Sequence, residues 1–134
     1  AFYPLFFWGI VGGFHSLLTP ELTSGDTPFM YAEYYIVHGG IIIIPLYFVF
    51  ARGFMVGKWT WAKVLGINVL LMAPVGLINY LVDANYMFLC QRPMVDNPFI
   101  MGDWPFYIVG FVAAGALHYG VLTLLFWKRI NKAA

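Results

Sequence analysis

One histidine lies in a position where it could act as a base inside a membrane. His38 is eight residues into an apolar run that starts at Met30, so its depth in a helix is about 12 Å. Glu33 and Tyr34 precede it by five and four residues, and the latter spacing puts Tyr34 on nearly the same helix face. Histidine suits general base catalysis because its side chain titrates near neutral pH. We predict His38 as the catalytic residue, with Glu33 and Tyr34 as substrate-binding residues; the alternative is that His38 is bonded to a neighbouring helix as a packing contact.

Two further polar residues are candidates for the same site. Asn79 belongs to a third apolar run that also contains Asn68, and buried amides of this kind favour helix packing or the wall of a polar cavity. Cys90 is the single cysteine and follows that run. It could be a nucleophile if His38 came within hydrogen-bond reach, and it is otherwise a buried, inert thiol. We predict Asn79 and Cys90 as substrate-binding residues.

Two other histidines leave a haem or pigment site open. His15 is near the end of the first apolar run, and His118 is deeper in the last one than His38 is in the second. Paired axial ligands need similar depths, which favours His15 with His38 over His38 with His118. The alternative for His118 is a contact between helices.

The composition shows which elements must position these residues. The chain has 134 residues, of which 10% are charged, 62% are hydrophobic and 20% are aromatic, with a net charge of +1. A soluble domain averages about 25% charged residues, so these values exclude an ordinary soluble domain and a disordered chain. The low net charge excludes a nucleic-acid binder. The sequence predicts an integral membrane protein.

The apolar runs predict an all-α, polytopic membrane protein forming a single domain over residues 1–134. About 20 helical residues cross a hydrocarbon layer. The predicted transmembrane helices are 2–18, 30–51, 59–82 and 104–127, joined on the outer side by loops 19–29 and 83–103. The first run is at the short limit, and the chain opens without Met or a basic leader, so we expect residues upstream of Ala1.

The basic residues predict the orientation of the helices. One side carries Arg52, Lys58, Lys63, Lys128, Arg129 and Lys132 and no acidic residue, while all six acidic residues face the other side. The positive-inside rule puts the basic side, with the C-terminus, in the cytoplasm. We expect a bacterial inner membrane.

Three segments together resemble one family of bacterial membrane proteins. They are the stretch from Phe6-Phe7-Trp8-Gly9 through Leu17-Leu18-Thr19-Pro20, the stretch Glu33-Tyr34-Tyr35-Ile36-Val37-His38-Gly39 with Pro45 downstream, and the stretch from Asn85-Tyr86-Met87-Phe88-Leu89-Cys90 through Pro98 and Gly102-Asp103-Trp104-Pro105. The chain resembles the YwaF-like integral membrane proteins. These are related to a transmembrane acyltransferase of ether phospholipid synthesis and remotely to the androgen-induced membrane hydrolases.

The resemblance implies a six-helix fold of which this chain holds the later part. It implies a Cys or Thr nucleophile on an upstream helix and a histidine on a later one, which His38 matches. Cys90 matches a cysteine of the later loop and not the nucleophile. The chain therefore resembles a family member with its base and without its attacking group.

The sequence supports one leading function and two alternatives. The first is lipid acyl transfer or ester hydrolysis with His38 as base. The alternatives are a non-catalytic helical subunit of a larger membrane complex and a haem- or pigment-binding module. Apart from that last alternative we expect no metal and no cofactor. The expected partners are membrane lipids and other transmembrane chains, and not nucleic acid.

Overall fold

The computed structural model describes residues 2–20, 22, 25, 27–94, 98 and 100–130, with side chains up to Trp127. The described residues form four α-helices and one 3-10 turn. The elements are α1 (Phe2–Leu18), α2 (Pro28–Arg52), α3 (Thr60–Val82), η1 (Tyr86–Phe88) and α4 (Phe106–Ile130). Three of these helices, α2, α3 and α4, are long and apolar enough to cross a membrane, and α1 is a shorter apolar helix. The all-helical class predicted from the sequence is confirmed.

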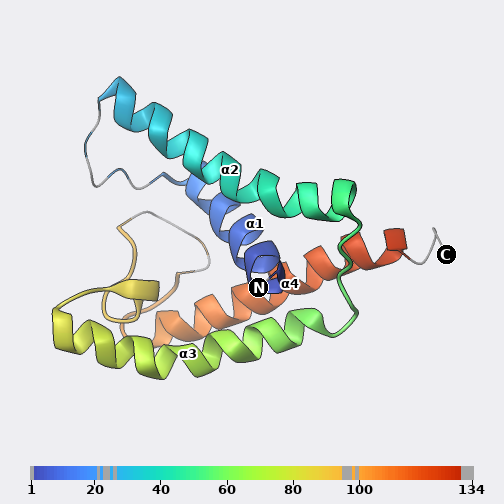
Figure 1. Ribbon diagram of the computed structural model, residues 1–134. Helices are drawn as coiled ribbons and strands as arrows, with labels where there is room; N and C mark the ends of the chain where they lie inside the picture. The colour runs from blue at the N-terminus through green and yellow to red at the C-terminus, as the bar shows by residue number, and fades with distance from the viewer. Residues whose placement is uncertain are drawn as a thin grey trace.

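The helices form two antiparallel pairs that diverge from one end, as Figure 1 shows. We call the pair α1–α2 the first arm and the set α3, η1 and α4 the second arm. Residues 53–59 join the arms at the end that we call the closed end. At the opposite, open end, α1 has already stopped while α2, α3 and α4 continue. This arrangement places a hollow between the arms.

Two glycines explain the close packing of the first arm. A Cβ at Gly9 would lie 2.9 Å from the carbonyl oxygen of Ile41, and one at Gly13 would lie 3.1 Å from that of His38 and 2.8 Å from the Ile42 side chain. Gly9 and Gly13 are four residues apart, which is the small-residue spacing that lets two membrane helices approach each other. The backbone of α1 therefore rests directly on α2 beside His38.

Two helix starts differ by two residues from those expected, for local reasons. α2 begins at Pro28 and not at Met30, because the Thr27 hydroxyl accepts a hydrogen bond from the Met30 amide (3.3 Å) and proline suits the first helical turn. α4 begins at Phe106 and not at Trp104, since a residue that precedes proline avoids helical dihedrals. The Phe106 amide donates instead to the Asp103 carbonyl at 2.7 Å.

The predicted loop 83–103 contains the 3-10 turn η1, which the Asn79 side chain binds through two hydrogen bonds. This side chain is 1% exposed, and its amide group donates to the Tyr86 carbonyl (2.9 Å) while its oxygen accepts from the Tyr86 amide (2.8 Å). Trp104 and Tyr107 then donate to the carbonyls of Leu89 (2.9 Å) and Phe88 (2.8 Å). The segment around η1 is thus packed back onto the second arm.

The core lies at the closed end and joins the two arms. Phe6 and Phe7 from α1 are fully buried, and they pack with Val56 of the linker, Val64 of α3 and Tyr119 of α4. Several rings meet edge to face, for example Phe6 with Phe7 at 5.1 Å between centroids and 86° between planes. Such pairs add to dispersion packing. The first half of α1 therefore packs against the second arm as well as against α2 at this end.

Candidate functional site

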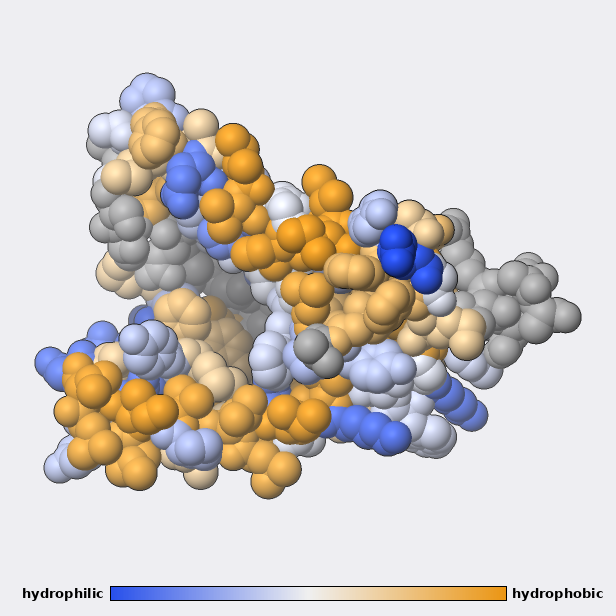
Figure 2. All heavy atoms as spheres, in the orientation of Figure 1, coloured by the Kyte–Doolittle hydropathy of each residue, from blue (hydrophilic) through white to orange (hydrophobic). Residues whose placement is uncertain are grey.

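The cavity between the arms has a volume of about 690 Å³. Figure 2 shows the hollow on the left, between two arms whose surfaces are mostly hydrophobic. The described lining residues come from both arms: Trp8, Val11, Gly12, His15, Ser16, Thr19, Tyr34, His38, Leu65, Asn68, Leu71, Met72, Met87, Phe88, Leu89, Pro93, Ile100, Ile108, Phe111, Val112, Ala114, Gly115, His118 and Tyr119. A mostly apolar cavity with a few converging polar groups is the usual form of a small-molecule site.

One stripe of α1 forms the first wall. Trp8, Gly12, His15 and Thr19 follow one another at intervals of four, three and four residues, so they share a helix face. The hydroxyl and the amide of Thr19 both donate to the His15 carbonyl, at 3.0 Å and 2.9 Å. These bonds satisfy one of the last carbonyls of α1, which have no partner within the helix. The last turn of α1 is thereby capped by hydrogen bonds where it borders the cavity.

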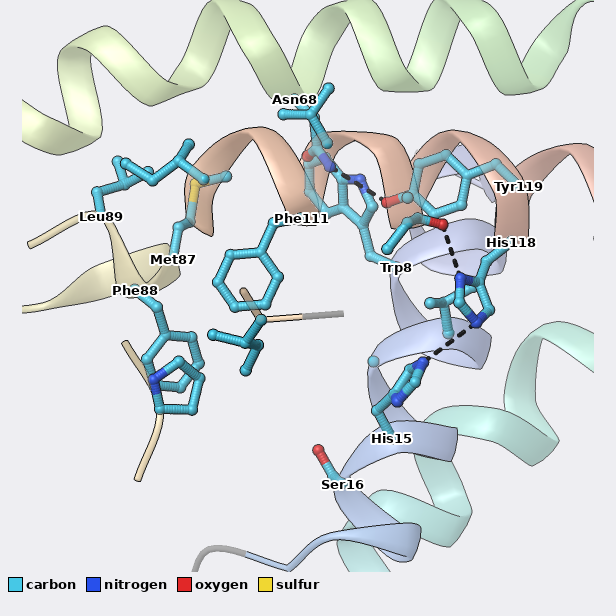
Figure 3. Close-up of a pocket in the computed structure, with 18 of the residues that line it drawn as sticks. Trp8, His15, Ser16, Asn68, Met87, Phe88, Leu89, Phe111, His118 and Tyr119 are labelled. Atoms are coloured by element: carbon cyan, nitrogen blue, oxygen red, sulfur yellow. Dashed lines mark hydrogen bonds between the residues drawn. The ribbon is translucent and has the colours of Figure 1, made fainter. Parts of the chain in front are cut away.

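His15 and His118 meet across the cavity floor (Figure 3). Their Nε2 atoms are 3.3 Å apart, and Nδ1 of His118 is 2.7 Å from the carbonyl oxygen of Ala114. A carbonyl can only accept, so Nδ1 of His118 carries a proton. In the neutral pair Nε2 of His118 is then the acceptor, and Nε2 of His15 donates to it. This contact is the polar link between α1 and α4.

His38 is held by its own helix and by Tyr34. Nδ1 of His38 donates to the Tyr34 carbonyl at 2.8 Å, and the two rings stack with centroids 4.1 Å apart. The Tyr34 hydroxyl donates to the Ser16 carbonyl at 3.0 Å, which ties α2 to the end of α1. Since Nδ1 carries the proton, Nε2 of the neutral ring is the basic nitrogen. The predicted placement of Tyr34 beside His38 is confirmed, and both residues line the cavity.

The second arm contributes an amide–phenol pair to the cavity. Asn68 of α3 donates to the Tyr119 hydroxyl at 3.2 Å, and the Tyr119 ring packs on Phe7 with centroids 5.0 Å apart. Tyr119 is only 5% exposed, so its hydroxyl needs such a partner. Asn68, which the sequence favoured for a polar cavity wall, lies in that wall.

The other predicted site residues lie apart from this cavity. Glu33 is exposed on α2, Cys90 is exposed after η1, and Asn79 is buried in its contacts with Tyr86. None of the three is among the described lining residues. Their assignment as substrate-binding residues stays a prediction, whereas Tyr34 and His38 share the cavity.

The histidine pairing also differs from the one that the sequence favoured. His15 faces His118 and not His38, and His38 is bonded to Tyr34. Sequence reasoning did not single out Trp8, Ser16 or Thr19. The interval of four, three and four residues along α1 was the signal that could have found this stripe. Among the described residues, no three His, Cys, Asp or Glu side chains gather as metal ligands would.

Comparison with known families identifies the type of protein. The family model of the TMEM164 family matches residues 1–123. The chain belongs to the TMEM164 family. Searches among curated proteins and among solved structures give no match. This TMEM164-family chain is a membrane protein with helical spans, in agreement with its composition and with its three long apolar helices.

Proposed function

We propose that this TMEM164-family protein binds a lipid ester in the cavity and catalyses acyl transfer or ester hydrolysis, with His38 as the general base. The observation that carries the proposal is the state of the His38 ring. Nδ1 donates its proton to the Tyr34 carbonyl, which leaves Nε2 of the neutral ring as the basic nitrogen, and His38 is one of the residues that line the cavity. A base in an apolar cavity within membrane-spanning helices suits a substrate that is itself dissolved in the membrane.

The proposed reaction follows from these groups. Nε2 of His38 takes a proton from an attacking hydroxyl, thiol or water, and the attacking atom forms a bond to the ester carbonyl carbon. The bond to the ester alkoxide then breaks, and the alkoxide receives the proton from the imidazolium. Through the resemblance to the YwaF-like family, the attacking group is assigned to an upstream helix, with Cys90 as the alternative. Asn68 belongs to the cavity lining, and its amide nitrogen has a second N–H besides the one that it donates to Tyr119, which can donate to an ester oxygen.

We also propose that α1 is a fourth span, in a six-helix family fold. Its 17 residues are apolar and pack along α2 and against α3 and α4. The basic residues near the closed end favour a cytoplasmic position for that end under the positive-inside rule. A bacterial inner membrane fits this orientation.

The experiment that tests the catalytic role is His38→Asn in the full-length protein. The Asn amide nitrogen can replace Nδ1 as donor to the Tyr34 carbonyl, while the basic nitrogen is lost. We expect the rate of transfer of a labelled acyl chain from phospholipid to fall about 10²–10⁴-fold. The control is Tyr35→Phe, which removes a hydroxyl from an exposed side chain of the same helix outside the described cavity lining and should retain activity. A rate unchanged in His38→Asn, in a protein that is demonstrably active, would sink the proposal.

A second candidate is a non-catalytic subunit of a larger membrane assembly. It is favoured by α2, which packs chiefly on α1 and leaves large apolar side chains such as Phe29, Ile36 and Ile43 at least 65% exposed. Lipid or other helices must cover these side chains. Extraction in a mild detergent followed by mass measurement separates the two cases, because a chain that runs alone argues against a subunit.

A further inference from the structure

A lysine at the closed end lies between two tryptophan rings. The Lys58 ammonium is 5.6 Å from the ring centroid of Trp59 and 5.9 Å from that of Trp127. Both distances are within the range of cation–π attraction. Trp59 belongs to the linker between the arms and Trp127 to α4, so two separate elements position this cation.

Two more cations flank Lys58 along the chain. Arg52 is the last residue of α2 and Lys63 lies in the first turns of α3, and all three side chains are exposed. The sequence has no acidic residue between positions 34 and 82 or after position 103. The described segments that form this end therefore carry positive side chains and no acidic one.

The linker that carries Lys58 is structurally fixed. Val56 is 1% exposed in the core, and the Phe54 amide donates to the Phe48 carbonyl at 3.0 Å. Tryptophan rings prefer the headgroup level of a bilayer, so Trp59 and Trp127 set Lys58 at the height of the lipid phosphates. Cation–π contact leaves the ammonium charged and still able to donate hydrogen bonds to a phosphate oxygen.

We propose that the closed end binds the headgroup of an anionic phospholipid, with Lys58 on the phosphate and Arg52 and Lys63 adding to the positive field. Basic clusters next to membrane helices attract anionic lipids in this way. The site is at the opposite end of the arms from the cavity opening. It is therefore independent of the catalytic proposal and of His38.

Lipid titration of the purified full-length protein, followed by native mass spectrometry, tests this site. Phosphatidylglycerol is the anionic probe and phosphatidylcholine is the neutral one. We expect tighter binding of phosphatidylglycerol, and a loss of about fivefold in that affinity for Lys58→Gln, with phosphatidylcholine binding unchanged. The matched control is Arg92→Gln, which removes a cation far from the closed end and should change neither affinity.

Three outcomes would overturn the proposal. They are equal binding of the two lipids by the unchanged protein, equal losses in Lys58→Gln and Arg92→Gln, and full displacement of phosphatidylglycerol by millimolar inorganic phosphate, which would indicate a free-phosphate site. Lys63→Gln is the second variant if Lys58→Gln does not fold. It should show the same selective loss of phosphatidylglycerol affinity.

Discussion

The two ends of the molecule join the same two arms by different means. At the closed end the contacts are aromatic and aliphatic, with Phe6 and Phe7 fully buried against Val64 and Tyr119. Toward the open end the arms are separated by the cavity, and the polar contacts between their described residues include the histidine pair His15–His118. The closed end thus contains the packed apolar core, while the open end contains the cavity and the polar groups that line it.

This difference indicates how the fold can tolerate an open cavity. α1 packs on α2 along its length through Gly9 and Gly13, and on the second arm mainly through its first half. The helix ends at Leu18, about one turn beyond His15, while α2, α3 and α4 continue. The cavity therefore exists because a short helix stops partway along longer ones. Stability and ligand binding should be separable by mutation.

The largest effect is expected for Gly13→Leu. The new side chain would collide with the His38 carbonyl and the Ile42 side chain, so α1 must move away from α2. We expect a loss of about 3 kcal/mol or more in the free energy of unfolding, measured in mixed detergent micelles. The control is Gly12→Leu, because a Cβ at Gly12 meets nothing within 4 Å. Equal losses in both variants would contradict the packing of the first arm.

A loss of about 3 kcal/mol is expected for Phe7→Ala, which opens a void in the closed-end core. The same unfolding measurement applies. Phe14→Ala is the matched control from the same helix, because Phe14 is 51% exposed and should cost much less. If Phe14→Ala were the more destabilising variant, the core would lie elsewhere.

A local effect at the open end is expected for Asn79→Ala. The amide and the carbonyl of Tyr86 would lose their partners, at a cost of about 2 kcal/mol. Hydrogen exchange of the backbone over residues 84–92 should accelerate. Asn68→Ala breaks a different bond, to Tyr119, and should leave exchange over 84–92 unchanged. Unaltered exchange in Asn79→Ala would show that the two hydrogen bonds of Asn79 do not stabilise the segment around η1.

The smallest effect is expected for the histidine pair. A double-mutant cycle of His15→Ala and His118→Ala should give a coupling energy of about 0.6–1 kcal/mol, the usual value for a hydrogen bond between membrane helices. A parallel cycle of His15 with His38 should give a coupling near zero, because His38 bonds to Tyr34. Stronger coupling in the second cycle would indicate that His15 pairs with His38 and not with His118.

The helices and the neighbours along one helix could be predicted from the sequence. The length of the apolar runs gave the four helices, and the four-residue spacing gave the contact of Tyr34 with His38. Such features depend on helix geometry alone. The spacing of Gly9 and Gly13 carries the same kind of information about helix packing.

The partners across helices could not be predicted in this way. Depth along each run favoured His15 with His38, yet in the structure Nε2 of His15 lies 3.3 Å from Nε2 of His118. This pairing depends on how α1 packs against α4, which helix geometry alone does not give. The sequence likewise does not show that the loop beyond Asn79 folds back to bond both ends of its amide.

The linker at residues 53–59 has a consequence for motion. It is the single covalent connection between the arms, and it begins at Gly53, whose φ of 68° places it in the left-handed region that glycine adopts readily. His38 and Tyr34 belong to the first arm, while Asn68 and His118 belong to the second. A rotation of one arm against the other about Gly53 would therefore change the distance between these two groups. Collective motions of this kind occur in microseconds to milliseconds, so relaxation-dispersion NMR should detect correlated exchange on both walls of the cavity.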